Sequence, residues 1–287
     1  MHPIDLPPEL VREVVVRALN EDIGTGDLTT LAVIPPDARA EAHFVFRQAG
    51  VVCGLPVVAA VFALVDPALT LRPRAAEGAR VSAGERVASV AGPARGLLSG
   101  ERVALNFLQR LSGIATLTAS YVEAVRGARA RILDTRKTTP GLRALEKYAV
   151  RVGGGVNHRS GLYDGVMLKD NHLAILAARG VDLAEAVRRA RAAVGPMVRV
   201  EVEVESVEQA AIAAEAGADL ILLDNMSPEQ LRAAVAAVAG RARTEASGGI
   251  NLHSIRAVAD SGVDFISVGA LTHSAPALDI GLDIEGA

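Results

Sequence analysis

The chain has 287 residues, half of them apolar, and a net charge of −3 from 30 Lys and Arg against 33 Asp and Glu. That length suits one large α/β barrel or two modest domains, and the charge predicts neither a nucleic-acid footprint nor a basic membrane-binding tail. The longest uncharged apolar run, 51–65, is too short to span a bilayer and contains Gly54 and Pro56. No secretory signal is visible and the single Cys53 cannot form an internal disulfide, so we expect a cytoplasmic protein.

The chain opens with a predicted amphipathic helix. Pro7 is typical of a helix start, and Leu10, Val14 and Leu19 fall on roughly one face. The segment EDIGTGDLTT, residues 21–30, predicts a turn after this helix.

The next part predicts a small α/β or α+β module. Strand-like runs cover 42–47 and 69–91, and a helix is expected over 55–65 between them. Within the second run, GARVSAGERVASVAG (78–92) predicts a strand hairpin like those of lipoyl and biotinyl carrier domains. A carrier needs a lysine for its prosthetic group, and none precedes Lys137, so we interpret this hairpin as scaffold.

A long helix is predicted to begin at Ser99, because apolar residues recur at helical spacing along it. Beyond this helix, strand-like and helix-like segments alternate. The predicted strands are 131–134, 165–168, 198–204, 219–224, 242–247 and 264–269. Alternation of this kind indicates a parallel sheet, and six or more units favour a barrel over an open sheet.

Carboxylates are expected at the mouth of this barrel, where the carboxyl ends of the strands meet. In the strand VRVEVEV the valines and glutamates alternate, which places Glu201, Glu203 and Glu205 on the interior. An unpaired carboxylate there costs several kcal/mol, so a cation has to meet them, either Lys169 or a divalent metal. Asp224, at the end of the next strand, adds a carboxylate to the same mouth.

Two glycine-containing loops after the last two strands predict a phosphate site. EASGGI (245–250) leads into a helix expected to begin near Asn251, and SVGAL (267–271) follows the next strand. Small residues let backbone N–H groups approach phosphate oxygens, and a helix N-terminus favours the anion. The candidate phosphate-binding residues are Ser247, Gly248, Gly249, Val268, Gly269 and Ala270, with His273 as a further donor.

A third group of candidates is basic and consists of Arg136, Lys137, His158, Arg159 and Lys169. Separate strand ends and the Gly-rich loop 153–159, which we expect to be flexible enough to wrap a ligand, bring them together. Such convergent donors fit a polyanionic small molecule. All three lysines of the chain lie between residues 137 and 169, which indicates positions that need a compact ammonium. Lys147 is the expected exception, exposed on a helix over 141–150.

Long motifs in the chain resemble the quinolinate phosphoribosyltransferase family. They are DTRKTTPGLRALEKYAVRVGGGVNHRSGLYDGVMLKDNH, VEVEVES, LILLDN and EASGGI, with ERVALNFLQRLSGIAT ahead of them and EDIGTGDLTT near the start. The resemblance implies an N-terminal α/β sandwich over 1–112 and an incomplete barrel of about seven strands over 113–287, of the type II phosphoribosyltransferase kind. It also implies that the last fifteen residues or so pack back on the sandwich, and that the subunits form a homodimer.

The resemblance further implies a reaction and its residues. Quinolinate and phosphoribosyl pyrophosphate would give nicotinate mononucleotide, CO2 and pyrophosphate in NAD synthesis, with Mg²⁺ as cofactor. Arg102 would reach the neighbouring subunit's site, and Lys137 would lie by the pyrophosphate. The candidate catalytic residues are Lys137, Lys169, Glu203 and Asp224, and the last two match the family's ribose or metal carboxylates. The candidate substrate-binding residues are Arg102, Thr135, Arg136, Lys137, His158, Arg159 and Lys169, and the Gly248 and Gly269 loops match the 5′-phosphate site.

Four other functions fit parts of the pattern less well. The first is a related phosphoribosyltransferase with another acceptor. The second is a Schiff-base aldolase with Lys169 as the amine, although several arginines are more anion clamps than an aldolase needs. A glycoside hydrolase could use the carboxylate pair, but aromatic residues make up only 3% and tryptophan is absent. A non-enzymatic carrier or scaffold is the last.

Overall fold

The computed structural model describes residues 6–285. Their contacts divide them into two compact units that are discontinuous in sequence. The sandwich unit comprises the described parts of Met1–Ala119, Thr138–Gly154 and Leu271–Ala287, and the barrel unit comprises Ser120–Lys137 and Gly155–Ala270. None of the helices between residues 6 and 285 is long and apolar enough to cross a membrane.

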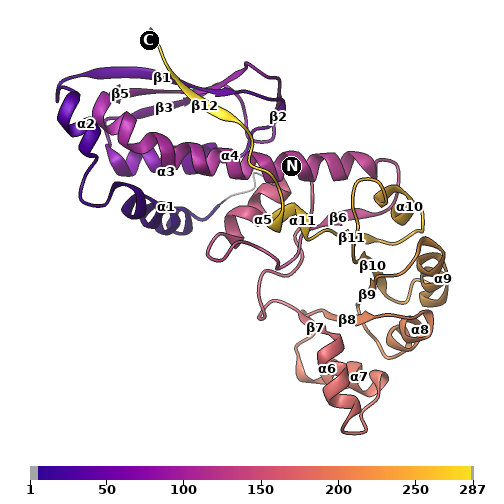
Figure 1. The fold of residues 1–287 in the computed structure, drawn as a ribbon. Coiled ribbons are helices and arrows are strands. Elements are labelled where there is room, and N and C mark those ends of the chain that lie inside the picture. The colour runs from indigo at the N-terminus through magenta and orange to yellow at the C-terminus, as the bar shows by residue number, and fades with distance from the viewer. Residues whose placement is uncertain (1–5, 286–287) are drawn as a thin grey trace. The chain divides into compact units, whose positions relative to one another are not determined.

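A four-stranded antiparallel sheet forms one layer of the sandwich unit, with helices along one of its faces (Figure 1). Its order is β12-β1-β5-β3, with bounds Ile280–Ile284, Arg39–Phe46, Arg86–Pro93 and Thr70–Pro73. One face is apolar because alternate residues of β1, including Phe44, point towards the helices. The Phe44 ring meets Phe62 of α3 (Leu55–Val65) edge to face at a centroid distance of 6.1 Å.

The chain end is tied into this unit. Strand β12 pairs with β1, and the segment before it contacts α4 (Ala94–Ala124). The side-chain amide of Gln109 donates to the Ile280 carbonyl at 2.7 Å, and the Leu278 N–H donates to the Gln109 carbonyl at 3.1 Å. A Cβ on Gly113 would lie 2.0 Å from the Pro276 carbonyl oxygen, so only glycine permits this approach.

The first helices differ from the prediction in face and boundary. Helix α1 (Pro8–Ile23) buries Val11, Val15 and Leu19, which places its apolar face one residue later than the predicted Leu10 and Val14. The predicted turn over 21–30 is partly helical, because α1 continues to Ile23 and α2 (Leu28–Val33) follows. Asp27 caps α2, accepting the Thr30 N–H at 2.9 Å.

The predicted hairpin over 78–92 is wrong, although its strands exist. Strand β4 (Arg80–Val81) pairs with β2 (Gly50–Val51), whereas β5 pairs with β1 and β3. The turn at Gly84 therefore passes the chain from a two-stranded ribbon to the main sheet. Local alternation could not reveal these partners, because strand pairing is a long-range choice.

The barrel unit contains a parallel sheet of six strands, one at each predicted position (Figure 1). The sheet order is β6-β11-β10-β9-β8-β7, with bounds Arg131–Leu133, Phe265–Ser267, Arg243–Ser247, Leu220–Asp224, Val200–Val204 and Val166–Leu168. A single parallel bridge between Leu133 and Val156 adds a seventh position beside β6. Within the described residues no pairing joins Val156 to β7, so the barrel is incomplete.

Helices alternate with these strands. They are α6 (Asp170–Ala177), α7 (Leu183–Ala193), α8 (Val207–Glu215), α9 (Pro228–Val238) and α10 (Ile255–Ala259). Polar caps start three of them: Asp182, Ser206 and Ser227 each accept a backbone N–H of the first turn. Helix α5 (Arg143–Val152) belongs to the sandwich unit. Helix α11 (Ala270–His273) begins at the last residue of the barrel unit, and its other residues belong to the sandwich unit.

Candidate active site

The glutamates of β8 face the barrel interior, as their alternation predicts. Val200, Val202 and Val204 are buried on the opposite face, while Glu201 is 4% exposed. Glu205 was expected with them; it lies just beyond the end of β8 and is exposed, although its charge still contributes to raising the pKa of Asp224.

Lys169 meets Glu203 across neighbouring strands. The register Leu168 with Val202 brings the residue after β7 beside Glu203, and Lys169 Nζ lies 3.0 Å from Glu203 Oε2. The Lys169 side chain is 45% exposed and the Glu203 side chain is 16% exposed. The ammonium therefore compensates the carboxylate while remaining open to a ligand.

Asp224 ends β9 beside this pair. Burial raises the pKa of its carboxyl, and the nearby Glu203 charge raises it further, while a hydrogen bond from Asn225 lowers it. Each of these carboxylates disfavours ionisation of the other, so a cation bound between them would relieve their repulsion. Oxygen donors are what Mg²⁺ prefers, so Glu203 and Asp224 fit the predicted magnesium site.

A second acidic group surrounds His158, formed by Glu201, which was predicted to face the interior, and Glu245, which was not predicted. His158 Nε2 lies 2.9 Å from Glu201 Oε2 and 3.6 Å from Glu245 Oε2. Its Nδ1 accepts the Arg159 N–H at 2.8 Å, so a neutral ring carries its proton on Nε2 and donates towards the glutamates. Glu245 is fully buried in β10, where burial and the Glu201 charge raise the pKa of its carboxyl to about 8. The alternation in RTEAS, which points Glu245 inward like the β8 glutamates, was the available signal.

We predict that Glu245→Gln makes folding less sensitive to pH. A carboxyl with a raised folded-state pKa is protonated in both states below its ordinary value of 4.5, so its penalty is absent there. Between about 4.5 and 8 the unfolded chain releases the proton while the folded chain retains it, so wild-type stability declines as pH rises. Glutamine resembles the protonated acid. Urea unfolding from pH 5 to 8 should show a shallower decline for the variant; equal slopes would contradict this assignment.

The loop containing His158 is anchored to β6. Asp134 is fully buried and accepts the Asn157 side-chain amide at 2.6 Å and the His158 N–H at 2.8 Å. The bridge at Val156 fixes the same loop. The loop 153–159 was predicted to be flexible enough to wrap a ligand. Over Val156–His158 these contacts instead hold the loop in a fixed conformation.

Two guanidinium groups lie near each other beyond this loop. Arg159 Nη1 donates to the Gly165 carbonyl at 3.0 Å, while its buried Nε has no hydrogen-bond partner among the described residues. Burial and the Arg136 charge lower the pKa of Arg159. Like charges in proximity, one with a donor to spare, indicate an anion site. Lys137 follows Arg136 after the end of β6. Its side chain is exposed, and its backbone N–H donates to Thr135 Oγ1 at 3.0 Å.

The loop after β10 has the expected glycine geometry. Gly248 and Gly249 have φ of 100° and 59°, a region that favours glycine. The Asn225 N–H donates to the Ser247 carbonyl at 2.9 Å, which ties this loop to the end of β9. The helix does not start near Asn251 as predicted. Asn251 instead accepts two N–H groups in a turn, and α10 starts at Ile255.

We predict that Gly248→Ala destabilises the fold more than Gly249→Ala. A Cβ at Gly248 would lie 2.1 Å from Asn225 Oδ1 and 2.9 Å from its backbone nitrogen, whereas a Cβ at Gly249 meets nothing within 4 Å. Both variants bear the left-handed backbone cost of about 1–2 kcal/mol, and only Gly248→Ala adds about 1–3 kcal/mol of overpacking. Urea unfolding of both variants measures the difference; equal losses would exclude the steric cause.

The loop after β11 carries the remaining phosphate candidates. Val268 is buried and its N–H donates to the Leu133 carbonyl at 3.0 Å, and Gly269 follows at the rim. Ala270 begins α11, a helix of only four residues. Gly269 and Ala270 therefore follow a strand end, as Gly248 does.

Three predicted residues belong to the sandwich unit. Arg102 is exposed on α4, and His273 is exposed with its Nδ1 2.6 Å from Ser274 Oγ. Lys147 was expected to be exposed, which is wrong, because α5 buries it to 4% exposure.

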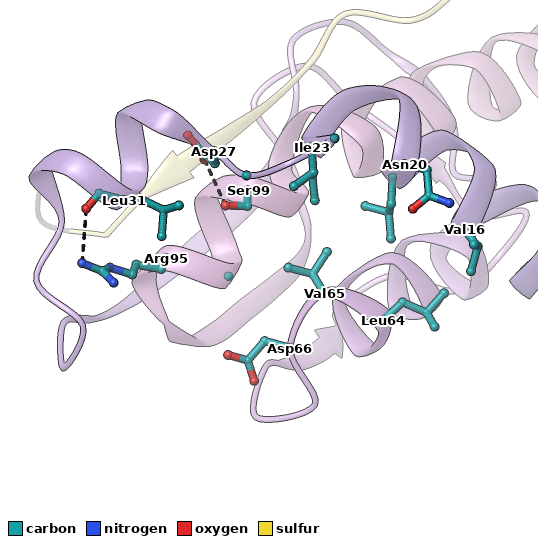
Figure 2. Close-up of a pocket in the computed structure, with 14 residues that line it drawn as sticks. Val16, Asn20, Ile23, Asp27, Leu31, Leu64, Val65, Asp66, Arg95 and Ser99 are labelled. Atoms are coloured by element: carbon teal, nitrogen blue, oxygen red, sulfur yellow. Dashed lines mark hydrogen bonds between the residues drawn. The ribbon is translucent and has the colours of Figure 1, made fainter.

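A cavity of about 480 Å³ in the sandwich unit lies among α1, α2, α3 and the start of α4 (Figure 2). Its wall combines aliphatic side chains such as Val16, Leu31 and Val65 with the acidic Asp27 and Asp66, and Arg95 is its single basic residue. None of the predicted site residues lines it. A strongly anionic substrate needs several cations, so the barrel rim is the better candidate site.

The barrel unit is an incomplete parallel α/β barrel with paired cations, paired carboxylates and glycine loops at its strand ends. This arrangement is that of enzymes with the type II phosphoribosyltransferase fold. The N-terminal domain of quinolinate phosphoribosyl transferase matches residues 27–112, and its C-terminal domain matches residues 114–283. The chain belongs to the quinolinate phosphoribosyltransferase family.

Relatives match over most of their length. A probable nicotinate-nucleotide pyrophosphorylase (carboxylating) of Bacillus subtilis is 47% identical over 264 residues, 92% of this chain and 90% of the relative. The nicotinate-nucleotide pyrophosphorylase (carboxylating) of Mycobacterium leprae is 45% identical, covering 96% and 98%. The crystal structure of NadC from Streptococcus pyogenes superposes with a TM-score of 0.92 at 46% identity, covering 98% and 99%.

Proposed function

We propose that the chain transfers phosphoribosyl from phosphoribosyl pyrophosphate to quinolinate with decarboxylation. The products are nicotinate mononucleotide, CO2 and pyrophosphate, in de novo NAD synthesis. The observation that carries this is the proximity of Arg136 and Arg159 near a rim that also carries the Lys169–Glu203 pair. Relatives named as quinolinate phosphoribosyltransferases, such as one from Nicotiana tabacum at 41% identity, support the same reaction.

The cations bind and align two anionic substrates. Phosphates carry about 1.5 to 2 negative charges each, and quinolinate adds two carboxylates, so the substrates repel each other without compensation. Arg136, His158, Arg159 and Lys169 receive the carboxylates or phosphates, while Lys137 lies by the pyrophosphate. Holding the pyridine nitrogen in line with ribose C1 turns a bimolecular encounter into a positioned one.

The acids act on the sugar. As the pyridine nitrogen bonds to C1 and pyrophosphate departs, positive charge develops on the ribose, and Glu203 and Asp224 stabilise it. The new bond leaves the ring nitrogen cationic. The adjacent carboxylate then departs as CO2, and its bonding electrons stay on the ring carbon, stabilised by the neighbouring cationic nitrogen. A proton from solvent takes the place of the carboxylate on that carbon, so no covalent enzyme nucleophile is needed.

Mg²⁺ is part of this proposal. Glu203 and Asp224 would hold it, and when bound it neutralises pyrophosphate charge. The raised pKa of Asp224 beside Glu203 supports a cation there.

We also place the enzyme in the cytoplasm as a homodimer in which Arg102 completes the neighbouring subunit's site. Its exposure on α4 supports this role. If so, inactive Arg102→Ala and Lys169→Ala variants should restore about a quarter of wild-type activity when refolded together in equal amounts, because half of the dimers then carry one intact site. No recovery, with heterodimers demonstrated by tagged chains, would show that Arg102 serves its own subunit.

The direct test is product formation. The protein is incubated with phosphoribosyl pyrophosphate, Mg²⁺ and either quinolinate or nicotinate, and CO2 and pyrophosphate are measured. We expect both products with quinolinate and neither with nicotinate. Pyrophosphate release with nicotinate alone would favour a related transferase with another acceptor, and borohydride trapping of a ketone on Lys169 would favour an aldolase.

A further inference from the structure

A second cluster of metal-type ligands lies on the sheet of the sandwich unit and has no part in the proposed reaction. Glu41 and His43 come from β1, and Glu285 follows β12 directly. One ligand atom of each lies within 4.8 Å of the others. We propose that these three side chains form a Zn²⁺ site.

Strand register places two like charges opposite each other. Ala42 pairs with Ile284 and His43 with Asp283, and the Glu285 N–H donates to the Glu41 carbonyl at 2.9 Å. Glu41 and Glu285 are therefore direct cross-strand neighbours. Opposed like charges destabilise an antiparallel pair, so this position favours a cation between the carboxylates.

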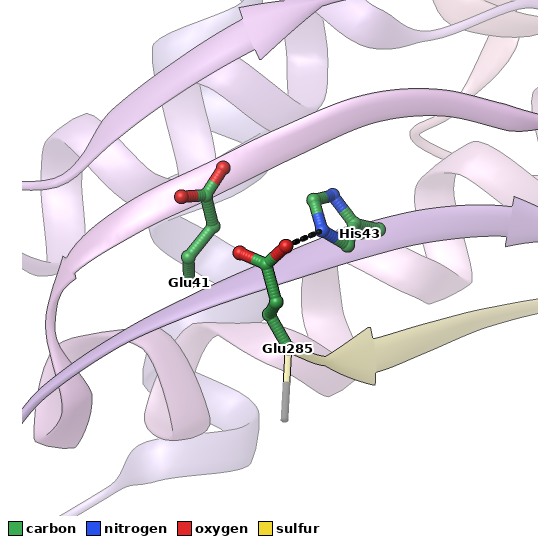
Figure 3. Close-up of side chains that lie close together, drawn as sticks. All are labelled: Glu41, His43 and Glu285. Atoms are coloured by element: carbon green, nitrogen blue, oxygen red, sulfur yellow. Dashed lines mark ion pairs between the residues drawn. The ribbon is translucent and has the colours of Figure 1, made fainter. Parts of the chain in front are cut away.

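His43 points into the same cluster. Its side chain is only 2% exposed, and neither ring nitrogen has a hydrogen-bond partner among the described residues. Figure 3 shows the Glu285 carboxylate between the Glu41 side chain and the His43 ring, with His43 Nε2 3.7 Å from Glu285 Oε1. A buried polar group without a partner is unfavourable, and a metal on Nε2 would remove part of that cost.

Two arginines lie on or beside β1, Arg39 before Glu41 and Arg47 after the strand, and neither forms an ion pair with Glu41 or Glu285 among the described residues. Arg47 forms an ion pair with Asp283, the cross-strand neighbour of His43. Across residues 6–285, neither Glu41 nor Glu285 forms an ion pair with a lysine or arginine. The two carboxylates therefore remain available as anionic ligands.

One imidazole and two carboxylates suit zinc better than magnesium. Mg²⁺ is bound through oxygen, whereas Zn²⁺ accepts nitrogen and oxygen at about 2.0–2.2 Å, which separates tetrahedral ligand atoms by about 3.3–3.6 Å. The spacing of 3.7 Å between His43 and Glu285 is close to that value, and the exposed Glu285 can close the rest. Three protein ligands leave a fourth position for water or another donor.

Zinc titration of the full chain, followed by NMR of the histidine ring nitrogens, tests the proposal. The barrel unit contains its own carboxylates and His158, so stoichiometry alone is ambiguous, and the resonances of His43 are the required readout. The spectrum of His43→Gln assigns them; if that variant does not fold, through-bond experiments on the wild type replace it. We expect Zn²⁺ to shift the His43 resonances saturably, independently of added quinolinate or phosphoribosyl pyrophosphate.

Glu285→Gln removes one ligand at an exposed position and should not affect folding. We expect it to weaken the Zn²⁺ response of His43 by about tenfold or more, whereas Glu215→Gln, at an exposed residue of α8, leaves it unchanged. Glu41→Gln should act like Glu285→Gln. Resonances of His43 that do not move with Zn²⁺, or equal responses in Glu285→Gln and Glu215→Gln, would overturn the proposal, and neither outcome bears on the transferase activity.

Discussion

Glu203→Gln is expected to lower kcat by about a hundredfold to a thousandfold, with a smaller change in the KM for quinolinate. The substitution keeps the shape of the side chain and removes the charge that lies 3.0 Å from the Lys169 ammonium. In the proposed reaction that charge matters most when the ribose becomes positive, which is in the transition state rather than in the bound substrates. Steady-state rates of CO2 release under saturating substrates measure the effect.

A matched control and a double variant give this prediction its specificity. Glu215→Gln makes the same chemical change on the exposed surface of α8 and should leave kcat unchanged. Lys169→Met is expected to be severe by itself, and the double variant Lys169→Met/Glu203→Gln should lose less than the product of the single losses, because the two side chains are in contact. Near wild-type turnover in either single variant would contradict the proposed roles.

The sequence predicted the barrel unit better than the sandwich unit for a physical reason. In repeated βα units, strands that follow one another in the chain usually lie side by side in the sheet. The periodicity of apolar residues therefore identifies the strands and helices, and their order in the chain identifies which strands are neighbours. The alternation in β8 therefore pointed Glu201 and Glu203 inward and called for the cation that Lys169 provides. In the sandwich unit the partners are distant in sequence, as with β1 and β12, and local pattern cannot specify them.

Residues that depend on three-dimensional burial were the ones missed. Glu245 stands in a short strand with ordinary composition, and its importance comes from complete burial beside His158 and Glu201. Lys147 lies in an amphipathic helix whose two faces could not be assigned to core or solvent from sequence, and the structure buries it. Both cases are charged side chains buried inside a fold, and charged residues are usually expected at the surface.

The order of the family-like motifs along the sequence did not reveal how the DTRKTTPG segment divides. Thr135–Lys137 belong to the barrel unit, whereas Thr138 onwards belongs to the sandwich unit. Within the sandwich unit, Glu146 of α5 accepts the Thr139 N–H at 3.0 Å and the Thr139 hydroxyl at 2.8 Å. The anchor of this segment is therefore a buried carboxylate a few residues downstream.

Arg110→Met is expected to lower the free energy of unfolding by about 3 kcal/mol, because it leaves that carboxylate without its counter-ion. Glu146 is fully buried, and Arg110 Nη2 lies 2.7 Å from its Oε1. Arg110 also donates to the Ala275 carbonyl at 2.8 Å and to the Thr272 carbonyl. Its side chain is 26% exposed, so solvent screens part of the interaction and the lower end of the usual range of about 3–5 kcal/mol applies.

Urea unfolding of three variants separates a buried charge from a general effect of losing an arginine. Arg17→Met breaks an exposed ion pair with Glu13 and should cost no more than about 0.5 kcal/mol. Arg110→Met/Glu146→Gln should be more stable than Arg110→Met, because the uncompensated charge is then absent. Hydrogen exchange at Thr139 should accelerate in Arg110→Met, since the acceptor of its N–H becomes mispositioned. If Arg110→Met instead unfolds with the same midpoint as Arg17→Met, the buried ion pair does not stabilise this unit, and the segment that carries Lys137 depends on other contacts.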